Sequence, residues 1–192
     1  MQANILMLLF VAFSLSVQAQ KKNEFVVNVG QSTVKWAGKK IVGGNTEGTI
    51  SLQSGKMILE GERLTAGEFV LSTNTIASST ASSRLISHLK NEDFFDVEKY
   101  PTAKFVITNV KSENGKSMIT GNMTIKGITK AITFPATILT HKNRVEAKVS
   151  GVKVDRTQYG IQYNSGSIFT SLGDKAIEDH FVLDISIIAE KK

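Results

Sequence analysis

The sequence predicts an all-β protein whose antiparallel strands are interrupted by one short helix. Two observations predict the strands: apolar and polar residues alternate with period two along most of the chain, and short turn sequences separate the alternating runs. A third observation predicts the helix, because residues 84–105 replace this alternation with helical spacing and a cluster of aromatic side chains. The chain lacks the strand–helix–strand spacing of a parallel sheet.

The alternating runs follow one another through the chain, and each has one apolar face. They lie at residues 25–29, 34–36, 50–52, 69–73, 103–110, 119–125, 145–149 and 181–188. Glycine, asparagine and serine residues between the runs predict turns at 43–45, 54–55, 113–115, 127 and 142–143. About eight such strands form either a sandwich or a closed barrel, and closure removes the exposed edges. A barrel of about eight strands holds packed side chains or one slim ligand.

The helical insert begins near Ser82 and Ser83, whose hydroxyl groups are suited to cap a helix N-terminus. Leu85 and Leu89 are four residues apart and therefore share one face of the helix. The helix ends before Pro101, because a proline ring forces the preceding residue into an extended conformation. The insert holds four of the chain's fourteen aromatic residues, Phe94, Phe95, Tyr100 and Phe105. An insert of this kind is suited to line or close an apolar cavity.

Residues 1–19 have the pattern of a cleaved signal peptide. A nearly continuous apolar run spans residues 5–13, and small residues at Val17 and Ala19 favour cleavage after Ala19. The run is too short for a helix that crosses a bilayer. A retained membrane anchor is the alternative, because residues 1–4 lack lysine and arginine. The cleavage pattern favours the signal peptide, and we expect a single mature domain, residues 20–192, that is periplasmic or secreted.

The composition restricts the classes of site and partner. The chain has no cysteine, so disulfides, thiolate metal sites and cysteine nucleophiles are excluded, and the fold depends on its core alone. The formal net charge of +6 suits an anionic partner such as a phosphate group or an acidic lipid surface. The lysines are scattered singly through strands and turns, which argues against nucleic acid as a partner.

Three segments carry a specific combination of motifs. The first contains His88-Leu89, DFFD at 93–96, Tyr100-Pro101 and Phe105; the second is GNMTIKGITK at 121–130; the third is DRTQYG at 155–160. In this order they resemble the central, hairpin and late motifs of the YceI-like family, and the resemblance spans about residues 24–189. Three motifs in the right order are far more specific than any one of them.

The resemblance implies an exported, lipocalin-like antiparallel β-barrel of about eight strands. Some members of this family carry an isoprenoid chain in the barrel. The resemblance therefore implies non-enzymatic binding, sequestration or transport of a long polyprenyl or quinone-like lipid. The partner would be this small-molecule lipid, with transient membrane contact, and we expect no other cofactor. A barrel with a hydrophobic mouth is also compatible with a two-fold homodimer.

The candidate apolar lining consists of aromatic residues from the strands and from the helical insert. A polyprenyl chain gains about 0.8 kcal/mol for each buried CH₂-sized unit, so a long apolar tunnel suffices to hold it. The candidates are Trp36, Phe69, Phe94, Phe95, Tyr100, Phe105 and Phe181. Phe94 and Phe95 are the strongest, because they lie beside the interruption of the strands. The alternative for each residue is an ordinary place in the core.

The candidates for head-group binding are Arg84, His88 and Arg156. Arg84 and His88 are four residues apart and share a helix face. Asp155 could hold the neighbouring Arg156 guanidinium in a forked ion pair, and such donors suit a pyrophosphate or a quinone oxygen. The alternatives are structural: Arg156 could tie the late part of the chain to the barrel, and His88 could anchor the helix.

No enzyme motif is found in the sequence, and no catalytic or metal-binding residue is assigned. Glu178-Asp179-His180 resembles a metal triplet, but in a strand Glu178 and His180 face one side and Asp179 the other. Two alternatives to the lipid carrier stay open. One is an exported hydrolase or metal-dependent enzyme that uses His180 with Glu178. The other is a barrel scaffold for protein interaction, whose interior would be packed rather than hollow.

Overall fold

The computed structural model describes residues 21–113 and 116–192. The predicted signal peptide and residues 114–115 of the predicted turn at 113–115 lie outside these residues. In chain order the elements are β1 (Lys22–Val27), β2 (Thr33–Lys39), β3 (Asn45–Glu60), β4 (Arg63–Ala77), α1 (Ser83–Lys90), β5 (Thr102–Glu113), β6 (Lys116–Ile125), β7 (Ile128–Thr140), β8 (Arg144–Asp155), the 3-10 helices η1 (Arg156–Tyr159) and η2 (Gly173–Lys175), and β9 (His180–Lys191). None of the helices in this described part is long and apolar enough to span a bilayer.

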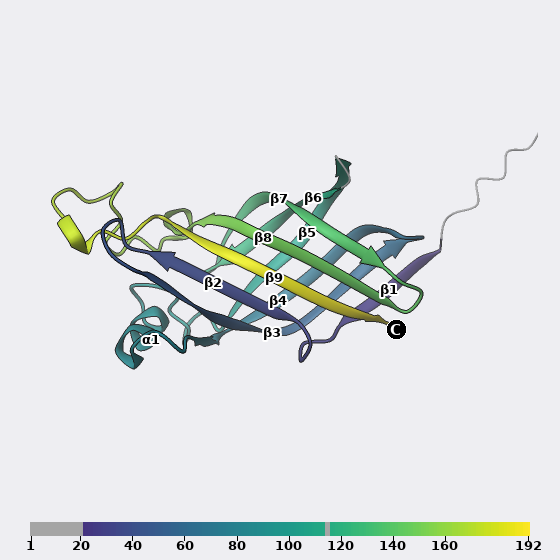
Figure 1. Cartoon of the computed structure of the whole chain (residues 1–192), viewed down its shortest axis with the longest axis horizontal. Helices are drawn as coiled ribbons and strands as arrows, with labels where there is room; N and C mark the ends of the chain where they lie inside the picture. Colours follow the sequence, from purple (N-terminus) through teal and green to yellow (C-terminus); the bar gives the residue numbers. More distant parts are fainter. Residues whose placement is uncertain (1–20, 114–115) are drawn as a thin grey trace, which may run out of the picture.

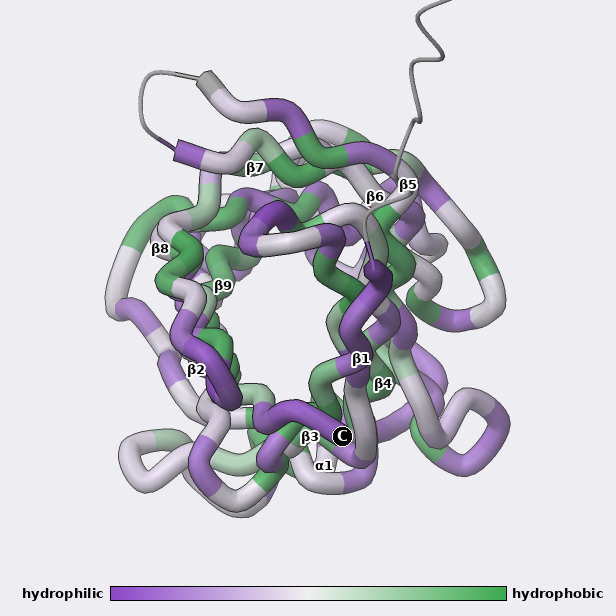
Figure 2. The backbone as a smooth tube through the Cα atoms, turned by 90° about the vertical axis from the view of Figure 1, so that its right-hand side faces the viewer, coloured by the Kyte–Doolittle hydropathy of each residue, from purple (hydrophilic) through white to green (hydrophobic). Residues whose placement is uncertain are grey.

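The strands close into a barrel with eight positions around its circumference (Figures 1 and 2). β1 and β2 share one of these positions, between β3 and β9. β1 pairs with residues 56–60 of β3, and β2 pairs with residues 45–50. The remaining strands follow in sequence order, and the pairing of β3 with β4 completes the ring. The prediction of an antiparallel barrel of about eight strands is therefore confirmed.

The period-two pattern of the sequence becomes an apolar interior and a more polar exterior. In β6, Ile119, Gly121 and Met123 are buried, and the residues between them are half-buried or exposed. Gly121 lies on the inner face, and this position requires glycine because no larger residue fits there. A Cβ atom at this position would lie 2.4 Å from the Phe105 ring of the neighbouring strand β5. Glycine thus leaves room for the Phe105 side chain inside the barrel.

The prediction of a turn in the middle of β3 is wrong. The sequence predicts a turn at 54–55, but the strand continues to Glu60, and the hairpin to β4 contains Gly61 with a φ of 61°. Around Ser54 the pairing of β3 with β4 shifts in register, so an irregularity within the strand replaces the turn. Gly55 is required by a close approach of β1, because a Cβ atom there would lie 2.7 Å from Val27 Cγ2.

The two ends of the barrel differ. At one end, which we call the closed end, apolar side chains with exposed fractions of 0–5% fill the interior: Phe25, Val27, Leu59, Val145 and Ala189. The C-terminus lies at this end (Figure 1). The opposite end, which we call the mouth, carries α1, the β2–β3 hairpin and the late segment, residues 156–179 between β8 and β9.

Helix α1 confirms the helical prediction. Ser82 is its N-cap, and the Ser82 side-chain oxygen accepts a hydrogen bond from the backbone N–H of Leu85 at 3.2 Å. The helix ends at Lys90, well before Pro101. None of its residues is fully buried, but Leu85 and Leu89 both contribute to the wall of an internal cavity. The insert therefore lines the mouth of the barrel, as its sequence predicts.

Candidate functional site

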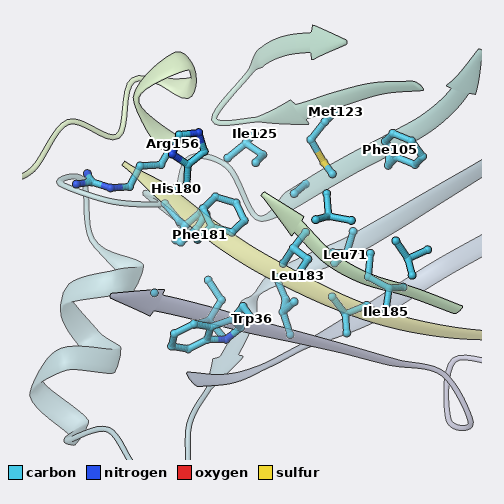
Figure 3. Close-up of a pocket in the computed structure, with 18 of the residues that line it drawn as sticks. Trp36, Leu71, Phe105, Met123, Ile125, Arg156, His180, Phe181, Leu183 and Ile185 are labelled. Carbon is cyan, nitrogen blue, oxygen red and sulfur yellow. The ribbon is translucent and has the colours of Figure 1, made fainter. Parts of the chain in front are cut away.

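An apolar cavity of about 690 Å³ runs inside the barrel from the mouth toward the closed end (Figure 3). This volume lies within the range of about 300–1,000 Å³ that is typical of small-molecule sites. Every strand except β1 contributes to the wall, as does α1. Val42 and Asn45 line the cavity at the mouth, whereas Met57, Leu64 and Ile187 line it near the closed end.

The cavity is long and narrow. β3 lines it both at its first residue, Asn45, and at Met57, twelve residues later. This separation is roughly 40 Å of strand, or roughly 30 Å along the axis of a barrel with strands tilted by about 40°. The cavity is therefore elongated along the barrel axis. The shape fits one extended chain better than a compact ring system.

The wall is almost entirely hydrocarbon. Figure 3 shows Leu71, Met123 and Leu183 among the side chains that surround the bore. Thr73 is a polar exception, but its hydroxyl donates a hydrogen bond to the Tyr100 carbonyl oxygen at 2.7 Å. The polar part of Thr73 is therefore already satisfied within the protein. A ligand in the bore needs apolar surface and few hydrogen bonds.

Six of the seven predicted aromatic residues line this cavity: Trp36, Phe69, Phe94, Phe95, Phe105 and Phe181. Phe95, from the segment after α1, meets Phe181 of β9 with the ring centroids 6.3 Å apart. The Trp36 indole donates from Nε1 to the Thr49 carbonyl oxygen at 3.1 Å. The structure thus brings together aromatic residues that are far apart in sequence. Their contact with a ligand stays a prediction.

Tyr100 is the exception, because it does not line the cavity. Its ring packs against the β6–β7 turn, where a Cβ atom at Gly127 would lie 3.2 Å away. Between Phe95 and Tyr100 the backbone of Asp96 has a left-handed φ of +48°, and the Asp96 carbonyl oxygen accepts from the Tyr100 N–H at 2.8 Å. Closeness in sequence was a poor guide to which way this aromatic ring points.

Sequence reasoning missed most of the wall, because most of the wall is aliphatic. Examples from four strands are Leu71, Ile107, Met123, Ile125, Leu183 and Ile185. A signal for them was present, since they occupy the apolar face of the alternating runs. Phe134 was also missed; its ring lies 5.4 Å from the Phe105 ring, centroid to centroid. The inner face of a barrel strand predicts cavity residues better than aromatic character does.

Arg156 lies at the mouth, but its guanidinium already donates hydrogen bonds to backbone carbonyls of the protein. The residue is 4% exposed. Its Nε donates to the Glu178 carbonyl oxygen at 3.0 Å, its Nη1 to the carbonyls of Ile161 and Tyr163 at 2.9 and 3.0 Å, and its Nη2 to that of Ile177 at 3.2 Å. Arg156 thus ties the late segment together, which is the structural alternative, and has little capacity left for a head group.

The predicted forked ion pair between Asp155 and Arg156 is wrong. Asp155 instead caps η1: its Oδ1 accepts hydrogen bonds from the Thr157 backbone N–H at 3.0 Å and hydroxyl at 2.6 Å, and its Oδ2 accepts one from Gln158 at 3.1 Å. The carboxylate beside the guanidinium is that of Asp179, 3.9 Å from Nη2. Burial lowers the pKa of Arg156, and the two neighbouring carboxylates oppose that shift.

Neither Arg84 nor His88 lines the cavity. His88 Nε2 lies 2.9 Å from Asp93 Oδ2, and the His88 ring packs edge-on against Phe94 and Tyr163, with centroid distances of 5.0 and 4.6 Å. These contacts fix α1 to the segment that follows it and to the late segment. The structural alternative for His88, an anchor for the helix, is therefore the one that the geometry favours.

The charges that line the mouth are balanced. Lys39 and Lys40 face the cavity there, as do Asp174, Glu178 and His180. Lys39 Nζ lies 3.7 Å from Glu178 Oε1, so these two charges pair with each other. Across the described ranges 21–113 and 116–192, no three histidine, aspartate or glutamate side chains gather as ligands for a metal ion. The mouth therefore offers a polar but roughly neutral rim.

Comparison with known proteins was made for sequence and for structure. A profile of the YceI-like domain matches residues 25–189, which is most of the chain. Protein YceI of Salmonella arizonae is 26% identical over 145 residues, 75% of this chain and 74% of that protein. A UPF0312 protein of Pseudomonas putida is 53% identical over 51 residues, a match that spans only 26% of this chain and 27% of the relative.

Solved structures share the fold. BcnA of Burkholderia cenocepacia is similar with a TM-score of 0.68 and 18% identity, over 84% of this chain and 98% of that chain. A polyisoprenoid binding domain from Saccharophagus degradans, implicated in plant cell wall breakdown, has a TM-score of 0.66 and 10% identity, over 88% and 98% of the two chains. The closed barrel, its helical insert and the profile match agree, and the chain belongs to the YceI-like family.

Proposed function

We propose that the protein binds one long apolar lipid of the isoprenoid type, polyprenyl or quinone-like, and sequesters or transports it in the barrel. The observation that carries this proposal is the unfilled hydrocarbon bore that extends from Val42 at the mouth to Met57 near the closed end. Protein interiors are normally close-packed, and an empty apolar cavity lowers stability. A barrel that served only as a scaffold would gain nothing from such a cavity.

Burial of the chain supplies the affinity. Each CH₂-sized unit that leaves water gains about 0.8 kcal/mol, and ordering of the flexible chain offsets part of this gain. The cavity is open at the mouth and closed at the other end, so the apolar tail enters first and the polar end of the lipid stays near α1. Similarity to a polyisoprenoid binding domain supports the same ligand class.

The mouth favours an uncharged head group. The buried guanidinium of Arg156 already donates to four backbone carbonyls, and Lys39 is paired with Glu178. A diphosphate would therefore meet little unmatched positive charge there. A quinone or an alcohol needs only hydrogen bonds, which Lys40, Asn45 and His180 of the cavity lining are able to donate.

Native mass spectrometry tests the proposal. Protein purified gently from two unrelated bacterial hosts is expected to carry an additional apolar mass, and organic extraction should release it as an isoprenoid quinone or polyprenol. Protein without ligand from both hosts would overturn the proposal. A polyprenyl diphosphate in the extract would support the carrier and contradict the uncharged head group.

Trp36 provides a second readout, because it is the single tryptophan of the chain and lines the cavity. Decylubiquinone, a short-chain quinone, is expected to quench its fluorescence in a saturable titration after the resident lipid has been removed. Denatured protein is the control for non-specific quenching. Quenching without saturation in the folded protein would argue against a defined site.

We also propose that the protein works outside the cytoplasm, after export by a signal peptide. The sequence pattern of residues 1–19 supports this, as does the absence of cysteine. N-terminal sequencing of the protein from a periplasmic extract should begin at Gln20. A cytoplasmic protein that retains residues 1–19 would contradict export.

A further inference from the structure

Exposed apolar side chains stand at the tips of two loops that surround the mouth. Ile41 and Val42, in the β2–β3 hairpin, are 53% and 55% exposed. Ile168 and Phe169, in the late segment, are 43% and 47% exposed. Scattered single apolar residues are normal on a protein surface, but a group of large ones marks an interaction site. We call these four residues the rim patch.

The two loops form one continuous surface. The backbone N–H of Ile41 donates to the Ala176 carbonyl oxygen at 2.9 Å, which fastens the hairpin tip to the late segment. A Cβ atom at Gly166 would lie 2.6 Å from Ile41 Cδ1, so the Ile41 side chain lies on the turn that precedes Ile168 and Phe169. Ile41 therefore lies against the segment that carries Ile168 and Phe169, although more than a hundred residues separate the two loops in sequence.

The rim patch is also continuous with the cavity. Val42 is both exposed and part of the cavity wall, and Gly43 and Gly44 beside it line the same opening. Figure 1 shows the hairpin and the late segment at the end of the barrel that carries α1, away from the C-terminus. A lipid chain that leaves the bore between these loops passes directly over the rim patch.

Lysines flank the apolar tips. Lys39 and Lys40 directly precede Ile41, and Lys175 lies in the late segment next to Asp174. Lys39 is paired with Glu178, so the loop tips outside the cavity opening carry a small positive excess, three lysines against Asp174 and Glu178. Lysine side chains lay their apolar stems along a hydrophobic surface and keep the ammonium group in water. An anionic leaflet attracts the lysine charges that no carboxylate matches. Apolar loop tips with adjacent lysines match the interface of an anionic bilayer, apolar below and negatively charged above.

We propose that the rim patch docks the barrel on an anionic lipid bilayer, with its four apolar side chains in the interface and the mouth facing the lipid. The biological use of this docking rests on the proposed lipid-carrier function. Docking places the opening of the bore at the membrane surface, so that an insoluble chain moves between bilayer and cavity without crossing water.

Co-sedimentation with vesicles tests the proposal. Purified protein is expected to bind vesicles of phosphatidylcholine and phosphatidylglycerol, and to bind pure phosphatidylcholine vesicles more weakly. The double variant Ile41→Ser, Phe169→Ser should lose roughly tenfold or more in vesicle affinity, because two large side chains no longer enter the interface. The matched control is Leu139→Ser, which changes a 51% exposed residue in β7, toward the closed end, and should bind like the unmodified protein.

Three results would overturn the docking proposal. They are absence of vesicle binding by the unmodified protein, an equal loss in Leu139→Ser, and a double variant that binds as well as the unmodified protein. A soluble dimer that dissociates in the double variant, without vesicle binding, would assign the rim patch to a second copy of the chain instead. Saturable quenching of Trp36 by decylubiquinone, measured without vesicles, reports the cavity separately. If the unmodified protein shows no saturable quenching, the proposed lipid-carrier function is contradicted. The docking proposal is tested by vesicle binding alone.

Discussion

The closed end and the mouth are built from the same alternating strands, but different interactions hold them together. At the closed end, apolar side chains such as Phe25, Leu59 and Val145, at most 3% exposed, fill the barrel. At the mouth the bore is hollow, and the segments around it are held by polar contacts, above all those of Arg156 with four backbone carbonyls. Hydrophobic packing closes one end, and a polar scaffold shapes the other.

Small residues keep the bore open between these two ends. Ala103, Ala136 and Ala147 are buried and line the cavity from β5, β7 and β8. A larger side chain at any of these inward-facing positions would project into the empty space. The contrast between the ends therefore depends on side-chain size as well as on the pattern of polar and apolar residues. Four experiments probe this contrast.

The largest effect is expected from Arg156→Met. This change leaves the carbonyls of Ile161, Tyr163, Ile177 and Glu178 without their shared donor. Loss of one partner in a buried charged network lowers the free energy of unfolding by about 3–5 kcal/mol, and urea denaturation measures it. Limited proteolysis should begin within the late segment.

The control for Arg156→Met is Arg84→Met in α1, which lies outside the cavity lining and should change stability by less than about 0.5 kcal/mol. Equal stability of the two variants would show that the mouth does not depend on the Arg156 contacts.

A pair of leucine truncations compares the two ends directly. Leu59→Ala at the fully buried closed end should lower the free energy of unfolding by about 2–5 kcal/mol. Leu183→Ala should lower it by less, because Leu183 borders the cavity and makes fewer contacts on that side. Urea denaturation of ligand-free protein measures both. A larger loss for Leu183→Ala would mean that the bore is more tightly packed than its volume indicates.

Filling the bore should weaken ligand binding. Ala147→Phe places an aromatic ring in the cavity and is expected to weaken decylubiquinone binding roughly tenfold, measured by quenching of Trp36. The neighbouring residue Lys148 is exposed and points outward, so Lys148→Phe is the matched control with unchanged affinity. Far-ultraviolet circular dichroism confirms that both variants keep the fold. Undiminished binding by Ala147→Phe would place the quinone outside the bore.

The smallest effect concerns acid stability at the mouth. Burial raises the pKa of Asp179, but hydrogen bonds from Ser165 and Ser167 and the charge of Arg156 outweigh burial and hold the pKa below its ordinary value. A depressed folded pKa adds stability above the unfolded value of about 4, and this stability is lost as the pH falls through the folded pKa. Asp179→Asn should therefore lower stability at neutral pH by about 1 kcal/mol and flatten the decline at acid pH.

Urea denaturation at a series of pH values compares Asp179→Asn with the unmodified protein. Leu59 lies at the closed end, away from Asp179. The free energy of unfolding of Leu59→Ala should therefore depend on acid pH as it does in the unmodified protein. If the free energy of unfolding depends on pH in the same way in Asp179→Asn and in the unmodified protein, the Asp179 carboxylate does not stabilise the mouth.

Much of the fold could be predicted because it depends on local patterns. Alternation gave the strands, and Ser82, Leu85 and Leu89 located the helix that the structure shows from Ser83 to Lys90. The course of β3 could not be predicted, because Ser54-Gly55 has the composition of a turn. Its glycine serves a close contact with Val27 instead, and that contact exists only once β1 has folded back across β3.

The candidate site was predicted in part for a similar reason. Aromatic residues in strands point inward with the alternation, so Trp36, Phe105 and Phe181 could be placed near the cavity. The role of Arg156 could not be read from its neighbour Asp155, since its acceptors are backbone carbonyls, which carry no sequence signal. The Tyr100 ring packs against Gly127 in the β6–β7 turn, a contact between distant segments that no local pattern indicates.

A crystal structure of protein purified with its resident lipid would show whether the hollow of this barrel is a lipid-binding bore. We expect continuous electron density for one extended chain that runs from Val42 at the mouth to Met57 near the closed end. A bore that contains only ordered water, or one that has collapsed until its walls touch, would contradict it.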